Sequence, residues 1–462
     1  MRRIVVAVLL GCLAPWAAQA AGSAPAEVAA QLGRAGLNDP TASAFLESLT
    51  TEIGPRLAGT DAMTRAAAWA EAKLKTLGFE NVHREAFPMK AWIRGTESAR
   101  VLSPAPQNLA VTALGGSLAT PADGIEAEIA LFRTYADLLA APAGSLADKI
   151  AVVTQRMVRS QDGGGYGAMN PVRRAGPSEA AKRGAVAYLL RSLGTDDHRL
   201  PHTGALNYAD GVAKIPAAAL STPDADQLER LAARGPVRIR LVLSPTERDA
   251  QSWNIVGEVK GRERPDDIVL IGAHLDSWDL GTGATDDGAG DAIVTGAAHL
   301  IAQLPQHPRR TIRVVLFGAE EMEFSGAAYA KAHEAEVSKI ALAGESDAGA
   351  RGVFAVQVPA VVHDGEFGRT LADVLAPLGA YLDRLPAQFS GSDTMGLQKL
   401  GVPVASLRQN MSDYFDTHHT ADDTLDKIDS KQLNQAVAVW AAFVYLAAET
   451  GTDFRPATAA AK

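Results

Sequence analysis

Apolar runs that alternate with helical patterns mark the second half of the chain. Four runs are typical of buried strands: residues 268–271, 312–317, 340–343 and 402–407. Segments with helical periodicity lie between or after them: residues 289–304, 325–336 and 431–450. Continuous apolar runs of this length, separated by helices, indicate parallel strands that are covered on both faces. We therefore predict an α/β fold with a mostly parallel central sheet and helices on both faces.

The first half of the chain begins with a helical segment. Residues 62–77 are rich in alanine, which favours a helix. Asp61 can cap the start of this helix and Gly78 can end it. We expect this helix to belong to the N-terminal part of the main domain.

The middle of the chain has a different texture. Between about residues 118 and 245 the apolar runs are shorter, and residues 160–177 are rich in Gly, Arg and Ser, which favours irregular structure. We predict that residues 118–245 form a smaller inserted α/β domain. The main domain would then consist of residues 21–117 and 246–462.

Residues 1–20 have the features of a secretory signal peptide. They contain two arginines, an apolar run and the small-residue sequence Ala18-Gln19-Ala20. We expect cleavage after Ala20 and export to the periplasm or the medium, with a lipoprotein signal ending at Cys12 as the alternative. No later stretch approaches the ~20 apolar residues that a transmembrane helix needs, so we predict no membrane span.

Composition narrows the choice of partners and cofactors. The chain is 47% hydrophobic and 21% charged, as in globular proteins, and its net charge is −9. No lysine or arginine cluster stands out, which disfavours nucleic-acid binding. Cys12 is the only cysteine and would leave with the signal peptide. Any metal site in the mature chain must therefore use His, Asp and Glu.

Acidic and imidazole side chains follow each of the four predicted strands. In open α/β sheets, ligands bind beyond the carboxyl ends of the strands. The residues at these ends are His274 and Asp276, then Glu320 and Glu321, then Asp347, and finally Asp416, His418 and His419. Such groups would repel one another at one edge unless a cation held them. This donor set suits Zn²⁺ or a similar divalent ion, and carboxylates can bridge two ions, so we predict a two-metal site.

The segment after the first of these strands is rich in glycine. Glycines between His274 and Asp286 allow the backbone to fold back, so that both side chains can face the same ions. Taken alone, Asp286-Asp287-Gly288 is equally typical of a turn that caps the following helix. The co-occurrence of acids and histidines at four strand ends favours the metal site.

Four motifs carry a resemblance to a known family. HLDSWDLGTGATDDGAG, GAEE, ESDAG and HHTADDT, in this order, resemble the co-catalytic di-zinc exopeptidase family of carboxypeptidase Q and the bacterial zinc aminopeptidases. The resemblance covers roughly residues 250–450 and is fainter before them. It implies the zinc-exopeptidase, phosphorylase/hydrolase-like fold, and it implies that the inserted segment is similar to a protease-associated domain that covers the cleft.

The resemblance implies a role for each motif residue. Asp286 would bridge two Zn²⁺ ions, His274 and Asp347 would complete one site, and Glu321 and His419 would complete the other. His419 takes this role rather than the histidine before it, because it stands four residues before an Asp-Thr pair, as in the family pattern.

Four further residues have implied or suggested roles around the metals. Glu320 would be the general base for a metal-bridged hydroxide. Asp276 would hold the His274 imidazole, as metal-bound histidines commonly require. His418 is a candidate for stabilising the oxyanion, and Asp393 belongs to a loop that would line the substrate cleft.

These roles together predict an exported zinc exopeptidase that hydrolyses dipeptides or short peptides with free termini. An aminopeptidase that releases N-terminal residues is the main alternative, because it would use the same metal ligands. A non-catalytic binding domain on the same fold is a third hypothesis. The resemblance also suggests a homodimer.

Overall fold

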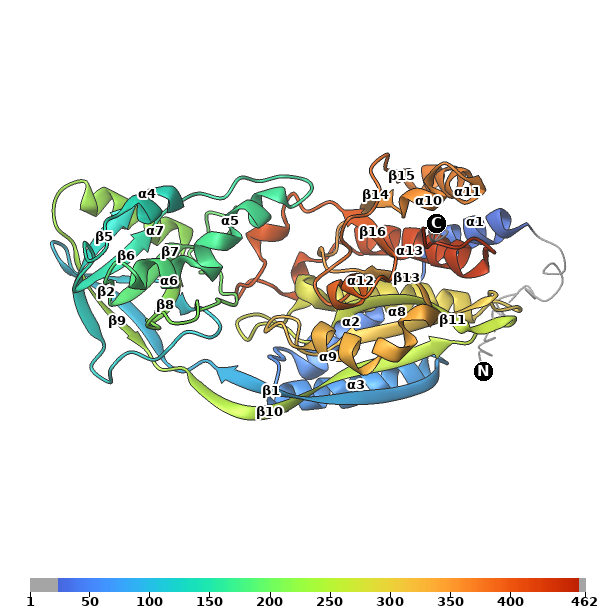
Figure 1. Ribbon diagram of the computed structural model, residues 1–462, viewed down its shortest axis with the longest axis horizontal. Coiled ribbons are helices and arrows are strands. Elements are labelled where there is room, and N and C mark those ends of the chain that lie inside the picture. The colour runs from blue at the N-terminus through green and yellow to red at the C-terminus, as the bar shows by residue number, and fades with distance from the viewer. Residues whose placement is uncertain (1–23, 457–462) are drawn as a thin grey trace, which may run out of the picture.

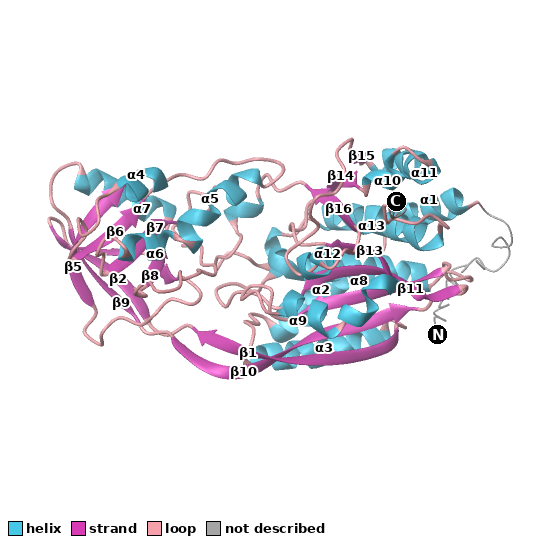
Figure 2. Cartoon of the chain, in the orientation of Figure 1, coloured by secondary structure: helices cyan, strands magenta, loops and turns pink. Residues whose placement is uncertain are grey.

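The protein has a mixed α/β fold with two eight-stranded sheets, shown in Figure 1. This computed structural model describes residues 24–456. The predictions about the signal peptide and the lipoprotein site at Cys12 concern residues outside this range. Within it, no helix combines the length and apolar character that crossing a membrane requires. Helices accompany the strands of both sheets (Figure 2).

The first sheet contains all four strands predicted from the second half of the chain. Its order is β1-β10-β12-β11-β13-β16-β14-β15. The central strands β12, β11, β13 and β16 run parallel, whereas β1, β10 and β14 pair antiparallel with their neighbours toward the centre and β15 runs parallel to β14. The strands span, in sheet order, Glu80–Ile93, Thr246–Val259, Arg310–Phe317, Arg264–His274, Ile340–Glu345, Val404–Gln409, Val353–Gln357 and Tyr381–Leu382.

Strand β11 shows why its sequence is apolar without interruption. Val269 and Ile271 pack in the core cluster that contains α3, α8 and α13 residues. Ile268 and Leu270 point the opposite way and pack with Tyr329 of α9. Because successive side chains of a strand alternate between faces, a strand with helices on both faces must be apolar at every position.

The second sheet is built entirely from strands between Glu97 and Leu243, and we call residues 97–243 the second unit. Its order is β3-β2-β9-β5-β6-β7-β8-β4. The strands span, in that order, Gln107–Leu109, Glu97–Ser103, Arg238–Leu243, Ile125–Phe132, Lys149–Val153, Ala187–Arg191, Ala217–Leu220 and Val111–Ala113. The sheet thus takes in strands that precede residue 118, where the inserted domain was expected to begin.

Two long strands, β1 and β10, connect the two sheets along one edge of the molecule (Figure 1). They pair from Glu80 and Glu258 at one end to Ile93 and Thr246 at the other. The chain enters the second unit at the end of β1 and leaves it at the start of β10. Both crossings therefore lie side by side.

Thirteen α-helices are described in residues 24–456. The helices outside the second unit span Pro25–Gly36 (α1), Thr41–Ser48 (α2), Asp61–Thr76 (α3), Ala289–Ala302 (α8), Ser325–Ala332 (α9), Ala360–His363 (α10), Glu366–Leu375 (α11), Met395–Lys399 (α12) and Ser430–Glu449 (α13). Those of the second unit span Tyr135–Ala140 (α4), Gly164–Arg174 (α5), Gly176–Ala181 (α6) and Thr222–Ala232 (α7).

Two local predictions differ from the structure. The side chain of Thr60, not Asp61, caps α3 by accepting a hydrogen bond from the Met63 backbone N–H. The stretch predicted to be irregular contains α5, because Met169 and Val172 lie on one face of the helix and are buried in the core of the second unit. Burial of an amphipathic face stabilises a helix that composition alone disfavours.

Candidate metal centre

The predicted ligands follow the ends of neighbouring parallel strands and gather in one cluster. His274 is the last residue of β11, and Asp286 lies in the turn Ala284–Gly288 before α8, where its own backbone is not helical. Glu321 follows β12, Asp347 follows β13, and His419 lies in the loop after β16. One group of these residues, His274, Asp286 and Glu321, has ligand atoms within 4.8 Å of one another, and two further groups bring in His418 beside Asp286 and His419, and Asp287 beside His274 and Asp347.

Asp286 lies at the centre of the cluster and divides it in two. Its Oδ1 lies 3.1 Å from Nε2 of His274, and the same Nε2 lies 3.8 Å from Oδ1 of Asp347. Its Oδ2 lies 3.1 Å from Nε2 of His419, which lies 3.2 Å from Oε2 of Glu321. Oδ1 of Asp286 thus contacts His274, whose Nε2 also lies near Asp347, and Oδ2 contacts His419, whose Nε2 also lies near Glu321.

These spacings fit zinc ions. Two ligand atoms at 2.0–2.1 Å from one tetrahedral Zn²⁺ lie about 3.3 Å apart. Three of the four contacts in the cluster, at 3.1, 3.1 and 3.2 Å, are close to this spacing. Oε1 of Glu321 is fully buried and has no hydrogen-bond partner. Within residues 24–456, no lysine or arginine pairs with Asp286, Glu320, Glu321 or Asp347. A buried group of carboxylates without basic partners is the environment that a divalent cation neutralises.

Both histidines present the correct nitrogen. Nδ1 of His274 lies 3.0 Å from the carbonyl oxygen of Asp276, and Nδ1 of His419 lies 3.2 Å from the carbonyl oxygen of Thr203. A carbonyl can only accept, so Nδ1 carries the proton in both rings. Nε2 is then free to bind a metal.

Burial and mutual contacts set the charges of the acids. Burial raises the pKa of Glu321 to about 7, although His419 opposes the shift. Burial, together with the charges of Asp347 and Glu321, raises the pKa of Glu320 well above its usual value. Burial would also raise the pKa of Asp286, but the surrounding histidines outweigh it and hold that pKa well below its ordinary value.

The carboxylate of Asp276 fixes the two glutamates more directly than it fixes His274. Its oxygens accept hydrogen bonds from the backbone N–H groups of Glu320 and Glu321, at 2.9 and 3.3 Å. Its Oδ1 lies 3.6 Å from Nδ1 of His274, farther than its own carbonyl oxygen. Asp276 therefore links the loop after β11 to the loop after β12.

Glu320 receives a hydrogen bond that the sequence analysis did not foresee. The hydroxyl of Ser392 donates to Oε1 of Glu320. Glu345, buried at the end of β13, holds the next part of this loop by accepting hydrogen bonds from the backbone N–H groups of Asp393 and Thr394. A Cβ on Gly391 would overlap the Glu345 carboxylate. No spacing rule reveals such a contact, because Ser392 comes from a loop far from the motif residues.

The three remaining candidates lie in different surroundings. His418 stacks on His419, with ring centroids 3.5 Å apart, and its Nε2 lies 3.5 Å from Oδ2 of Asp286. Asp393 is buried, and its Oδ1 accepts a hydrogen bond from Ser325 at 2.6 Å. Asp416 forms an ion pair with Arg159 of the second unit and does not join the cluster.

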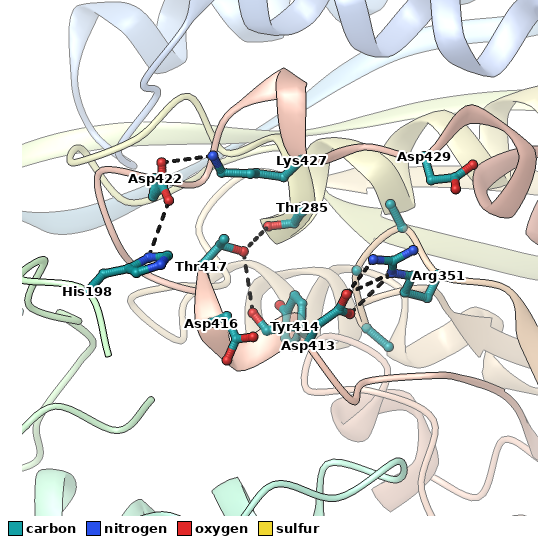
Figure 3. Close-up of a pocket in the computed structure, with 13 residues that line it drawn as sticks. His198, Thr285, Arg351, Asp413, Tyr414, Asp416, Thr417, Asp422, Lys427 and Asp429 are labelled. Carbon is teal, nitrogen blue, oxygen red and sulfur yellow. Dashed lines mark hydrogen bonds and ion pairs between the residues drawn. The ribbon is translucent and has the colours of Figure 1, made fainter. Parts of the chain in front are cut away.

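A polar cavity of about 320 Å³ lies beside the cluster (Figure 3). Thr285, Tyr414 and Thr417 line it, and His198 of the second unit lines it from the opposite side. None of the predicted ligands lines this cavity, nor does Glu320. We therefore do not assign it to the reaction site.

Comparisons with known proteins place the chain among peptidases. The family description "Peptidase family M28" matches residues 254–444. Carboxypeptidase Q of Mus musculus is 37% identical over 404 residues, covering 87% of this chain and 84% of that protein. Aminopeptidase YwaD of Bacillus subtilis (strain 168) is 25% identical over 416 residues, covering 87% and 83%. A crystal structure of a peptidase M28 precursor from Shewanella amazonensis SB2B has a TM-score of 0.91 and 48% identity, covering 94% and 98%.

The fold and the cluster of histidines and acids define a metallopeptidase, a class of hydrolase. The chain belongs to peptidase family M28. This confirms the family resemblance and the enzyme class that the motifs indicated.

Proposed function

We propose that this protein is an exported zinc exopeptidase that hydrolyses dipeptides or short peptides with free termini. The observation that carries the proposal is the position of Asp286, whose Oδ1 contacts the histidine of the His274–Asp347 pair and whose Oδ2 contacts the histidine of the His419–Glu321 pair. A single metal ion would need only one of these pairs. Two pairs around a shared carboxylate support two zinc ions per chain.

Each residue of the cluster then has a definite role. His274 and Asp347 would hold one zinc ion, Glu321 and His419 would hold the other, and Asp286 would be a ligand common to both. Bound zinc polarises the peptide carbonyl and lowers the pKa of water. The ligands come from four separate loops at the ends of β11, β12, β13 and β16, so the sheet itself sets their spacing.

Glu320 acts as the general base in this proposal. Its carboxylate, 4.0 Å from Nε2 of His274, takes a proton from the attacking water and delivers it to the leaving amine. Burial raises its pKa well above the ordinary value, which makes the carboxylate a stronger base. The hydrogen bond from Ser392 holds Oε1, so that Oε2 is the oxygen directed at the reacting water.

The similarities favour an activity like that of carboxypeptidase Q. The mouse carboxypeptidase Q is 37% identical to this chain, whereas the Bacillus subtilis aminopeptidase is 25% identical. Because the ligand set is common to both directions of cleavage, an aminopeptidase is the second candidate. We also propose that the second unit is a protease-associated-like insert that limits access to small substrates. A homodimer is a further hypothesis.

Two measurements test the proposal. Glu320→Gln should abolish peptide turnover while zinc content stays at two ions per chain, because glutamine cannot accept the proton. Glu323→Gln is the matched control, since Glu323 lies three residues away, is half-exposed and pairs with Arg174. Retained turnover in Glu320→Gln would contradict the base assignment, whereas absence of turnover in the wild-type protein would support a non-catalytic relative of this fold.

The direction of cleavage is read from blocked dipeptides. If the protein is a carboxypeptidase or dipeptidase, amidation of the substrate's carboxyl end should reduce turnover strongly. If acetylation of the amino end alone abolishes turnover, the aminopeptidase candidate is correct. Removing zinc with a chelator should eliminate activity toward every substrate, and zinc should restore it.

A further inference from the structure

The main chain of Thr203, in the second unit, forms two hydrogen bonds with His419. The backbone N–H of Thr203 donates to the carbonyl oxygen of His419 at 3.0 Å. The carbonyl oxygen of Thr203 accepts from Nδ1 of His419 at 3.2 Å. The first contact fixes the backbone of His419, and the second fixes the rotation of its ring. The acceptor that orients one proposed metal ligand therefore comes from the other sheet of the molecule.

His419 needs such support because its backbone is strained. Its φ is +62°, in the left-handed region that residues with a side chain adopt at a cost. Non-glycine residues persist in that region only where the surrounding structure over-determines them, at a cost of order 1–3 kcal/mol. The two contacts with Thr203 supply part of that determination.

Thr203 is itself held by Arg94, which lies between the two sheets. The guanidinium donates to the Thr203 hydroxyl at 3.2 Å and to the carbonyl oxygen of Ala113 at 2.8 Å. It also forms a bidentate ion pair with Asp279, at 2.8 and 2.9 Å. Asp279 lies in the loop that follows His274. Arg94, whose side chain is 9% exposed, thus connects that loop to Thr203.

An apolar contact runs beside this polar connection. Trp278, from the same loop after β11, is buried in a core cluster of the second unit. Its ring centroid lies 5.7 Å from that of His419 and 6.4 Å from that of Trp92. The second unit therefore contacts the His419 side of the cluster through both polar and apolar groups.

We propose that the second unit completes the metal centre: the main chain of Thr203, held by Arg94, orients His419 and thereby sets the zinc affinity of the site that His419 shares with Glu321. Arg94 and Thr203 are positioning residues. The proposal rests on the proposed function only in that His419 binds zinc. It predicts an asymmetric effect, because His274 and Asp347 have no contact with Thr203.

Zinc affinity of the full-length protein tests this inference without reference to turnover. Metal-free protein is titrated with zinc against a chromophoric chelator, and the melting temperature is measured with and without zinc. Arg94→Met should weaken one of the two sites by about 10–100-fold, the usual effect of losing a group that orients a metal-bound histidine. It should leave the other site within about twofold and reduce the rise in melting temperature that zinc produces.

Three variants make the result specific. Thr203→Ala removes the hydroxyl that Arg94 holds and should weaken the same site, whereas Thr203→Ser should restore the affinity. Arg183→Met is the matched control: Arg183 is 12% exposed, pairs with Glu179 inside the second unit and does not touch the cluster. It should lower the melting temperature of the metal-free protein but leave both zinc affinities unchanged.

Each outcome decides between the alternatives. Wild-type affinity at both sites in Arg94→Met and Thr203→Ala would overturn the inference, as would an equal loss at both sites. If Arg94→Met does not fold, the pair Thr203→Ala and Thr203→Ser decides alone. A wild-type protein that binds two zinc ions but cleaves no peptide would contradict the proposed function and leave this inference standing. An active wild-type enzyme, together with unchanged zinc affinities in the variants, would support the proposed function and overturn this inference.

Discussion

The carboxylate of Asp423 accepts a hydrogen bond from the backbone N–H of Asp286, with the two atoms 3.2 Å apart. The same carboxylate accepts from the backbone and the hydroxyl of Thr285, both at 2.6 Å. Asp423 stands four residues after His419. One loop therefore supplies a proposed ligand and also fixes the backbone of the residue that the two proposed sites share.

Asp423→Ala should release that backbone. Loss of three accepted hydrogen bonds leaves buried donors unpaired, which costs about 1–3 kcal/mol each. We expect the zinc affinity of this variant, or its rate of peptide turnover, to be about 10–100-fold lower than in the wild-type protein. Asp422→Ala is the control, because Asp422 forms partly exposed ion pairs with Lys427 and His198, each worth about 0–1 kcal/mol. Similar losses in both variants would show that Asp423 has no special role.

Ser392→Ala should lower kcat and leave KM nearly unchanged, because the hydroxyl contacts the base and not the proposed ligands. A decrease of about tenfold corresponds to one hydrogen bond worth ~1.4 kcal/mol in the transition state. Ser392→Thr retains a hydroxyl and should recover most of the rate. In Ser390→Ala the lost hydroxyl contacts only backbone groups of Glu345 and Ala405, so this variant reports the effect of disturbing the loop alone. Equal kcat values in Ser392→Ala and wild type would contradict the role.

The pair of His333 and Glu85 should make stability depend on pH. Nε2 of His333 lies 2.9 Å from Oε1 of Glu85, and this hydrogen bond raises the pKa of His333 despite partial burial. A raised pKa means that the folded state favours the protonated ring. The stabilisation is therefore complete below the unfolded pKa of about 6.5 and is lost as pH rises through the folded value. The difference in melting temperature between wild type and His333→Gln should be larger at pH 6 than at pH 9. An equal difference at both pH values would exclude the pair as its source.

Two glycine substitutions should change stability in opposite directions. A Cβ on Gly36 would lie 2.7 Å from the backbone Cα of Ala438, where α1 packs on α13. Gly36→Ala should therefore destabilise the protein by about 1–3 kcal/mol. Gly167 lies inside α5 with open space around its Cα, so Gly167→Ala should be neutral or stabilise by up to about 1 kcal/mol. Urea unfolding of the three proteins measures both effects.

The sequence predicted the central strands, and the candidate ligands that it suggested lie together in the structure, for a common physical reason. A strand buried on both faces is apolar throughout, as β11 is, and its carboxyl end is where polar ligand residues become visible. His274 and Glu321 are each only a few residues from such a strand. The local sequence therefore indicates both the strand and the candidate ligand at its end.

Contacts between distant segments were not visible in the sequence. Ser392 is 72 positions from Glu320, and Thr203 is 216 positions from His419. A serine hydroxyl or a backbone carbonyl leaves no motif, because its role depends on where tertiary packing places it. The long antiparallel strands β1 and β10 were missed as well, since much of β1 is exposed and lacks a continuous apolar run.

The pairing of Ile93 with Thr246 makes β1 and β10 a β-hairpin whose turn has been replaced by a folded unit of roughly 150 residues. The closure entropy of a loop grows only slowly with its length, so such an exchange costs the host sheet little. The arrangement suggests that the unit was inserted into an existing hairpin, and it also suggests an engineering experiment. A short turn between β1 and β10 could rejoin the two strands and yield a minimal enzyme core. That core would lack Thr203, and its zinc affinity would show how far the two halves have come to depend on each other.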